Sequence, residues 1–136
     1  MKVGVLIVTH YRLGEEFLQA LRLILPEAPG FEAVSVEPTM AVEDMRSKIA
    51  AGLKTADAGE GVLILTDMFG GTPSNMSLSF HDEHQVEVVT GMNLPMLIKL
   101  ATMHDEKPLD ELAAFIKAYG QRNISVASEL IPEDDS

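Results

Sequence analysis

The sequence predicts an α/β fold in which a mainly parallel sheet is covered by helices on both faces. Short runs of apolar, often β-branched residues recur along the chain, first at residues 3–9 and again at 61–66. Between these runs, apolar residues return at intervals of three and four, as on one face of a helix. Strands that alternate with helices build right-handed βαβ units, so we expect an open three-layer α/β/α sandwich.

Each expected element follows from its local pattern. Strands are expected at residues 3–9, 31–36, 61–66, 86–90 and 124–131. Helices are expected at residues 13–25, 42–53, 72–80, 95–103 and 109–119. Thr72 and Pro73 suit the N-cap and first turn of the third helix, and Gly120 is expected to end the last one. The charged residues 132–136 are expected to fray as a disordered tail.

Length and composition limit the class of protein. A chain of 136 residues with 46% hydrophobic residues is suited to one compact domain, so we expect residues 1–136 to fold as a unit. The longest apolar run, Val3–Val8, is far shorter than the ~20 residues of a membrane helix, and no signal-peptide pattern is present. We therefore expect a cytoplasmic protein. Because the chain has no cysteine, thiolate catalysis and cysteine-ligated zinc are excluded.

The charge of the chain argues against one class of partner. Ten basic and 21 acidic side chains give a net charge of −11. Such a chain repels a phosphate backbone, so we expect no nucleic-acid partner.

Polar side chains follow two apolar strands, at the edge where parallel sheets bind their ligands. His10 ends the first strand and Asp67 follows the third. In the strand order 2-1-3-4, which we predict, these strands are neighbours about 4.8 Å apart, so ring and carboxylate can meet. A carboxylate that accepts a hydrogen bond from Nδ1–H would leave Nε2 of His10 unprotonated and nucleophilic. We therefore predict that His10 and Asp67 are catalytic.

A glycine-rich turn follows Asp67 at the same edge. The run Gly70, Gly71, Thr72, Pro73 and Ser74 can cradle an anion through backbone N–H groups and hydroxyls, although it also suits a plain turn with a threonine cap. Neither a Walker lysine nor a G-x-G-x-x-G run accompanies it. A nucleophilic histidine beside such a cradle suits the receipt and release of a phosphoryl group, with Gly70, Gly71, Thr72 and Ser74 as phosphoryl-binding residues.

The remaining histidines and the exposed apolar residues near the turn have simpler interpretations. At the spacing of His81, His84 and His104 we favour solvated turns over a metal site, and we expect no metal and no cofactor. Met68 and Phe69, next to the cradle, suit a rim on which a partner docks.

Three segments in this order resemble the IIA component of the mannose family (mannose/fructose/sorbose) of the bacterial phosphoenolpyruvate-dependent sugar phosphotransferase system (PTS). They are VGVLIVTH, GVLILTDMFGGTPSN and VVTGMNLPML. The resemblance implies that His10 accepts a phosphoryl group from the phosphocarrier HPr and passes it to a IIB protein. It also implies that Asp67 is the hydrogen-bond partner of His10, and that Thr72 and the Gly71 backbone contact the phosphoryl group.

The resemblance implies further features of the site and the assembly. Asn93 and Pro95 fall in the family's loop at the rim of the site, which Tyr11 joins although many relatives have a glycine or another small residue there. The family is a homodimer that exchanges a C-terminal antiparallel strand, for which residues 123–130 are the candidate. Since the chain ends at Ser136 without a IIB domain, we expect the acceptor to be a separate protein and membrane contact to occur only through a transporter complex.

Two alternatives remain beside a PTS carrier. The first is the phosphotransfer subunit of a dihydroxyacetone kinase, whose members share this type of fold but lack the GGTPSN run. The second is a regulatory or non-catalytic module that binds a small anion. The sequence does not predict which sugar, if any, is served.

Overall fold

The computed structural model describes residues 3–82 and 85–132. Four parallel strands form one sheet in the order β2-β1-β3-β4, as predicted. They are β1 (Gly4–His10), β2 (Phe31–Val36), β3 (Val62–Thr66) and β4 (Val86–Thr90). Because β1 and β3 are paired in register from Gly4 with Val62 to Val8 with Thr66, their carboxyl ends lie side by side.

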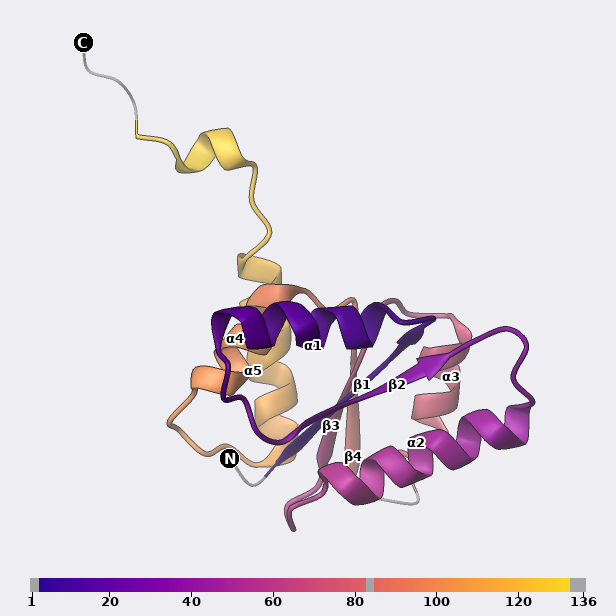
Figure 1. The fold of residues 1–136 in the computed structure, drawn as a ribbon. Helices are drawn as coiled ribbons and strands as arrows, with labels where there is room; N and C mark the ends of the chain where they lie inside the picture. Colours follow the sequence, from indigo (N-terminus) through magenta and orange to yellow (C-terminus); the bar gives the residue numbers. More distant parts are fainter. Residues whose placement is uncertain (1–2, 83–84, 133–136) are drawn as a thin grey trace.

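Helices cover both faces of this sheet, which confirms the predicted three layers (Figure 1). They are α1 (Leu13–Ile24), α2 (Val42–Ala56), α3 (Thr72–Leu78), α4 (Leu94–Thr102) and α5 (Leu109–Arg122). Val5 and Ile7 of β1 belong to the core under α1, α4 and α5, whereas Leu6 and Val8 belong to the core under α2 and α3. Successive side chains of a strand point to opposite faces, so β1 must be apolar throughout to fill both cores.

Helix α3 differs from the prediction at both ends. Gly71, with an extended backbone, is the N-cap in place of Thr72, which is the first helical residue. The helix ends at Leu78 rather than at Phe80, because the following N–H groups bond three residues back: Phe80 N–H donates to the Ser77 carbonyl at 3.1 Å. Bonds of this span tighten the last turn beyond α-helical geometry.

The prediction that Gly120 ends the last helix is wrong, because α5 continues to Arg122. A Cβ atom on Gly120 would lie 2.5 Å from Sδ of Met96 in α4. The glycine therefore allows the two helices to pack closely, and it does not serve as a left-handed C-cap. The local sequence pattern of α5 does not indicate this contact between the two helices.

The predicted C-terminal strand is not present in the described residues of this single chain. Residues 123–132 are exposed and include a short 3₁₀ helix, Ala127–Leu130. This segment extends away from the sheet and pairs with neither of its free edges, at β2 and β4 (Figure 1). The part of the predicted tail at 133–136 lies outside the described residues.

No helix in the described ranges combines the length and apolar character that a membrane crossing requires.

Candidate functional site

The carboxyl ends of β1 and β3 bring His10 and Asp67 into contact. Nδ1 of the His10 ring lies 2.8 Å from Oδ2 of Asp67, and the backbone N–H of His10 donates to the same oxygen at 3.1 Å. An ionised carboxylate only accepts hydrogen bonds, so Nδ1 must carry the proton. In the neutral ring, Nε2 then keeps its lone pair, which is the arrangement expected of a nucleophile.

The two side chains differ in their access to solvent. The His10 side chain is 39% exposed, whereas that of Asp67 is 13% exposed. The carboxylate is sheltered enough to hold one position, and the ring remains open to a reacting molecule. This combination suits a histidine that exchanges a group with another protein.

Buried threonines hold the two strand ends in place. Oγ1 of Thr9 accepts the N–H of Gly14 at 2.7 Å, which joins the end of β1 to the start of α1. The carbonyl of Thr66 accepts the N–H groups of Gly91 and Met92, each at 3.0 Å, which joins the end of β3 to the loop after β4. Both threonines are fully buried, and the bond from Gly14 to Thr9 forms away from competing water.

Gly71 lies directly against the His10 ring. A Cβ atom at residue 71 would be 2.5 Å from Cε1 and 2.9 Å from Nε2 of His10. Those distances are too short for any real side chain, so only glycine leaves room for the ring in this position. The backbone of the glycine-rich turn thus flanks the nitrogen that bears the lone pair.

The other residues of the turn have different surroundings. Gly70 has φ +89°, a conformation that favours glycine, and Thr72 is exposed in the first turn of α3. Ser74, in contrast, is fully buried, and its Oγ has no hydrogen-bond partner among the described residues. Solvent does not reach the Ser74 hydroxyl, whereas Gly71 and Thr72 of the same turn are accessible to a phosphoryl group that arrives from solvent.

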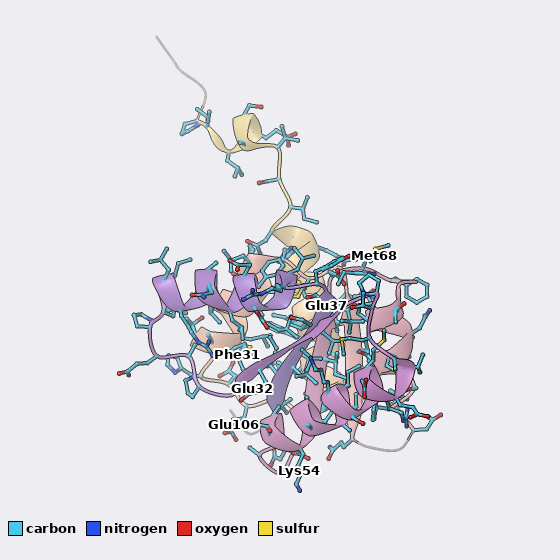
Figure 2. The ribbon with its side chains drawn as sticks, turned by 45° about the vertical axis from the view of Figure 1, so that its right-hand side comes forward. Phe31, Glu32, Glu37, Lys54, Met68 and Glu106 are labelled. Atoms are coloured by element: carbon cyan, nitrogen blue, oxygen red, sulfur yellow. The ribbon has the colours of Figure 1, made fainter. Side chains whose placement is uncertain are left out.

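Exposed apolar side chains lie next to the histidine and the carboxylate. Tyr11 follows His10 in the chain, and Met68 and Phe69 follow Asp67; all three are largely exposed. Figure 2 shows Met68 at the end of the molecule opposite Lys54 and Glu106.

The two residues after β4 that were expected at the rim, Asn93 and Pro95, have structural roles in this fold. Oδ1 of Asn93 accepts the N–H of Met96 and so caps α4, while Nδ2 of Asn93 donates to the Gly120 carbonyl at 3.0 Å. Pro95 is half-buried in the first turn of the same helix. Asn93 thus fixes α4 against α5 with both ends of its amide.

Sequence reasoning missed an ion pair beside the site. Nε of Arg12 lies 2.9 Å from Oε2 of Glu15, and Oγ of Ser35 donates to Oε1 of Glu15 at 3.2 Å. The bond to Glu15 raises the pKa of Arg12, and the bonds from Arg12 and Ser35 lower the pKa of Glu15. The i,i+3 spacing of Arg12 and Glu15 in the sequence could have indicated this ion pair.

The two other histidines that the structure describes, His81 and His104, have different surroundings. His81 lies 3.5 Å from a carboxylate oxygen of Asp82 and 3.7 Å from one of Glu87, and His104 lines a separate cavity with Lys99 and Lys107. His84 lies outside the described residues. Across residues 3–82 and 85–132, no group of three or more metal-ligating side chains is placed to hold a metal ion.

Comparisons with known proteins place this chain in a family. The family model described as "PTS system fructose IIA component" matches residues 4–117. The mannose-specific EIIAB component of the PTS from Escherichia coli K12 is 31% identical over 126 residues, which are 91% of this chain and 39% of that protein. The chain therefore spans well under half of that relative's length.

Two further relatives match along nearly their whole length. The fructose-specific EIIA component from Bacillus subtilis 168 is 29% identical over 128 residues, which cover 93% of this chain and 88% of that one. The solved structure of the mannose/sorbose-specific IIA subunit from Enterococcus faecalis is 32% identical with a TM-score of 0.84, and the match covers 100% of this chain and 99% of that one. The chain thus belongs to the mannose family of IIA components of the sugar phosphotransferase system.

Proposed function

We propose that this protein is a phosphohistidine carrier of the PTS in which His10 holds the phosphoryl group. The observation that carries the proposal is the 2.8 Å contact between Nδ1 of His10 and Oδ2 of Asp67. It commits Nδ1 to a hydrogen bond and leaves Nε2 as the nucleophile on a ring that is 39% exposed. Membership of the IIA family agrees with a transferase component of this kind.

The transfer step that we propose requires no metal. The lone pair of Nε2 attacks phosphorus, and a new N–P bond forms as the N–P bond of the donor phosphohistidine breaks. The electron pair of the broken bond returns to the donor nitrogen. The His10 ring becomes more positive as the bond forms, and the Asp67 carboxylate stabilises that charge while the proton stays on Nδ1.

Residues of the glycine-rich turn are proposed to hold the phosphoryl oxygens. The backbone of Gly71 flanks Nε2, and the exposed Thr72 follows it directly. Backbone N–H groups and a hydroxyl can donate hydrogen bonds to phosphoryl oxygens at this place. The left-handed Gly70 sets the direction of the turn.

We propose HPr as the donor and a IIB protein as the acceptor, with the whole exchange taking place in the cytoplasm. The name of the Escherichia coli relative joins EIIA with EIIB, which supports a IIB unit as the next carrier. A net charge of −11 favours contact with basic surfaces on these partners. Membrane contact would then occur only through the transporter complex.

We further propose that residues 1–136 act as one IIA domain in a homodimer that exchanges residues 123–130 as a strand. Ile124, Val126, Leu130 and Ile131 are exposed on a segment that extends from the body of the chain, and burial in a partner would remove this apolar surface from water. Sedimentation velocity should give a dimer for the full chain and a monomer for a chain ending at Asn123. A full chain that sediments as a monomer would contradict the exchange.

Phosphoryl transfer with purified components tests the function. The protein is incubated with labelled phosphoenolpyruvate, enzyme I and HPr, and we expect one acid-labile phosphoryl group per chain. His10→Ala should abolish the label, whereas the matched control His104→Ala, on an exposed histidine away from the site, should retain it. Label that persists in His10→Ala, or that never appears in the wild type, would overturn the proposal.

A further inference from the structure

Tyr11 has an unusual backbone conformation. Its φ of +49° makes it the sole non-glycine residue of the described chain in the left-handed region. For a residue with a Cβ atom this region is strained, and a large side chain is rarely found there. Tyr11 occupies it immediately after His10, so the strain lies beside the reacting ring.

The neighbouring structure imposes this conformation. The chain passes from β1 to α1 through only Tyr11 and Arg12. The N–H of Tyr11 donates to the Val36 carbonyl at 2.8 Å, and its carbonyl accepts from Thr9 Oγ1 at 3.4 Å. Helix α1 packs so closely on β1 that a Cβ atom on Gly14 would be 2.9 Å from Ile7. A glycine at residue 11 would satisfy the same bonds without the strain.

The side chain of Tyr11 contributes little to the fold. It is 57% exposed and lies in neither apolar core. Tyr119, by comparison, is partly buried and stacks with Phe115 at a centroid distance of 6.4 Å. Among the described residues, the Tyr11 ring has no aromatic or cationic partner and its hydroxyl has no hydrogen bond. A tyrosine at this position therefore raises the free energy of the folded backbone, and packing of its side chain does not offset that cost.

We propose that Tyr11 is a specificity-determining residue whose ring contacts the protein that donates the phosphoryl group. The inference rests on the proposed function. For transfer, phosphorus must come within about 3–3.5 Å of Nε2. A donor whose phosphoryl group is on its own side chain must therefore lay its surface over the residues that flank His10. Tyr11 is the residue next to His10 in the chain, and tyrosine provides a large, rigid contact at low entropic cost.

Three substitutions at residue 11 distinguish the effect of the aromatic ring from the effect of the strained backbone. Tyr11→Gly removes both, Tyr11→Asn removes the ring and tolerates a left-handed backbone, and Tyr11→Phe retains both. Leu23→Ala is the matched control, because Leu23 is an apolar side chain of α1 that is 85% exposed. Each variant is assayed with phospho-HPr for KM and kcat, and for its melting temperature.

We expect activity and stability to change in opposite directions. Tyr11→Gly and Tyr11→Asn should raise KM for phospho-HPr about tenfold with kcat unchanged, as for the loss of one interface anchor. Tyr11→Gly should also raise Tm by about 2–4 °C through relief of strain. Tyr11→Phe and Leu23→Ala should keep the wild-type KM, within about twofold.

The outcomes separate this inference from the proposed function. If the wild type takes no phosphoryl group from phospho-HPr, the proposed function fails and the role of Tyr11 fails with it. If the wild type is phosphorylated and Tyr11→Gly has the wild-type KM, only the role of Tyr11 is overturned. A fall in the Tm of Tyr11→Gly would also overturn it, because the ring would then support the fold.

Discussion

One oxygen of Asp67 accepts both hydrogen bonds that fix His10, although the two residues are 57 positions apart in the chain. The ring donates to Oδ2 from Nδ1 at 2.8 Å, and the backbone N–H donates at 3.1 Å. Met68 N–H donates to the other carboxylate oxygen at 3.2 Å, so the carboxylate is itself held in place. A single group thus sets the position, the orientation and the tautomer of the histidine.

Removal of this carboxylate should impair transfer more than folding. We expect Asp67→Ala to lower the rate of His10 phosphorylation by about 10²-fold or more. Without the carboxylate, the ring is no longer held in one tautomer, and the positive charge that it gains during transfer is no longer stabilised. Asp67→Asn retains the shape but not the charge, and should be similarly slow. Single-turnover assays with phospho-HPr measure these rates. Rates within twofold of wild type for both variants would show that the carboxylate has no such role.

Gly71→Ala should displace the His10 ring. The new Cβ would lie 2.5 Å from Cε1 and 2.9 Å from Nε2, and the part-exposed ring can turn away more easily than the backbone can. A misplaced reacting group typically costs about 10²-fold in kcat/KM. Stability should change little, because the ring gives way into solvent.

Gly120→Ala is the matched control for Gly71→Ala. Its Cβ would lie 2.5 Å from Sδ of Met96, which is buried between α4 and α5. Overpacking of this kind destabilises a fold by about 1–3 kcal/mol, so Gly120→Ala should lose stability in urea and keep its transfer rate. If Gly71→Ala and Gly120→Ala lose transfer rate and stability in the same proportion, the role assigned to Gly71 beside the His10 ring is wrong.

The contact between His10 and Asp67 could be predicted from the sequence because parallel strands end at a common edge. Two polar residues, His10 and Asp67, follow apolar strands, and the order β2-β1-β3-β4 was sufficient to bring them together. The role of Gly120 was missed because it depends on the distance between α4 and α5, which no local pattern encodes. The left-handed Tyr11 was missed for a similar reason, since the turn between β1 and α1 imposes it.

Thr9→Val should destabilise the junction between β1 and α1. Oγ1 of Thr9 accepts the Gly14 N–H at 2.7 Å in a fully buried position, so the valine leaves that donor without a partner. An unsatisfied buried donor costs about 1–3 kcal/mol. Thr66→Val is the comparison, because among the described residues Thr66 Oγ1 makes a single long contact, of 3.4 Å, to the Met68 carbonyl. Urea unfolding should rank Thr9→Val as the less stable variant, and the reverse ranking would contradict this assignment.

The ion pair beside the site should make stability depend on acidic pH. Bonds from Arg12 and Ser35 lower the pKa of Glu15, so the folded state binds a proton there less readily than the unfolded state does. This contribution is present above the pKa of Glu15 in the unfolded chain and is lost as the pH falls through the lower pKa of the folded state. The side chains are exposed and screened, so the effect is small. The fall in Tm between pH values of about 6 and 3 should be smaller in Glu15→Gln than in the wild type; an equal fall would contradict the coupling.

The residue patterns predicted most of the helices and strands, but they predicted the ends of these elements less accurately. Asn93 was expected at the rim of the site, and the sequence did not reveal that its amide also caps α4 and donates to the Gly120 carbonyl, a partner 27 residues away. The C-terminal segment has the composition of a strand, and strands form only where a pairing edge is available. In this single chain, residues 123–132 extend away from the free edges at β2 and β4 and pair with neither, which local composition does not reveal.

Phosphorus NMR of the protein after exposure to phospho-HPr tests the central claim most directly, because it identifies the nitrogen that carries the phosphoryl group. Nδ1 of His10 is committed to Asp67 at 2.8 Å, so the account predicts one phosphoramidate, on Nε2 of His10, that is absent from His10→Ala. A phosphoryl group on Nδ1, or no phosphoramidate at all, would contradict it.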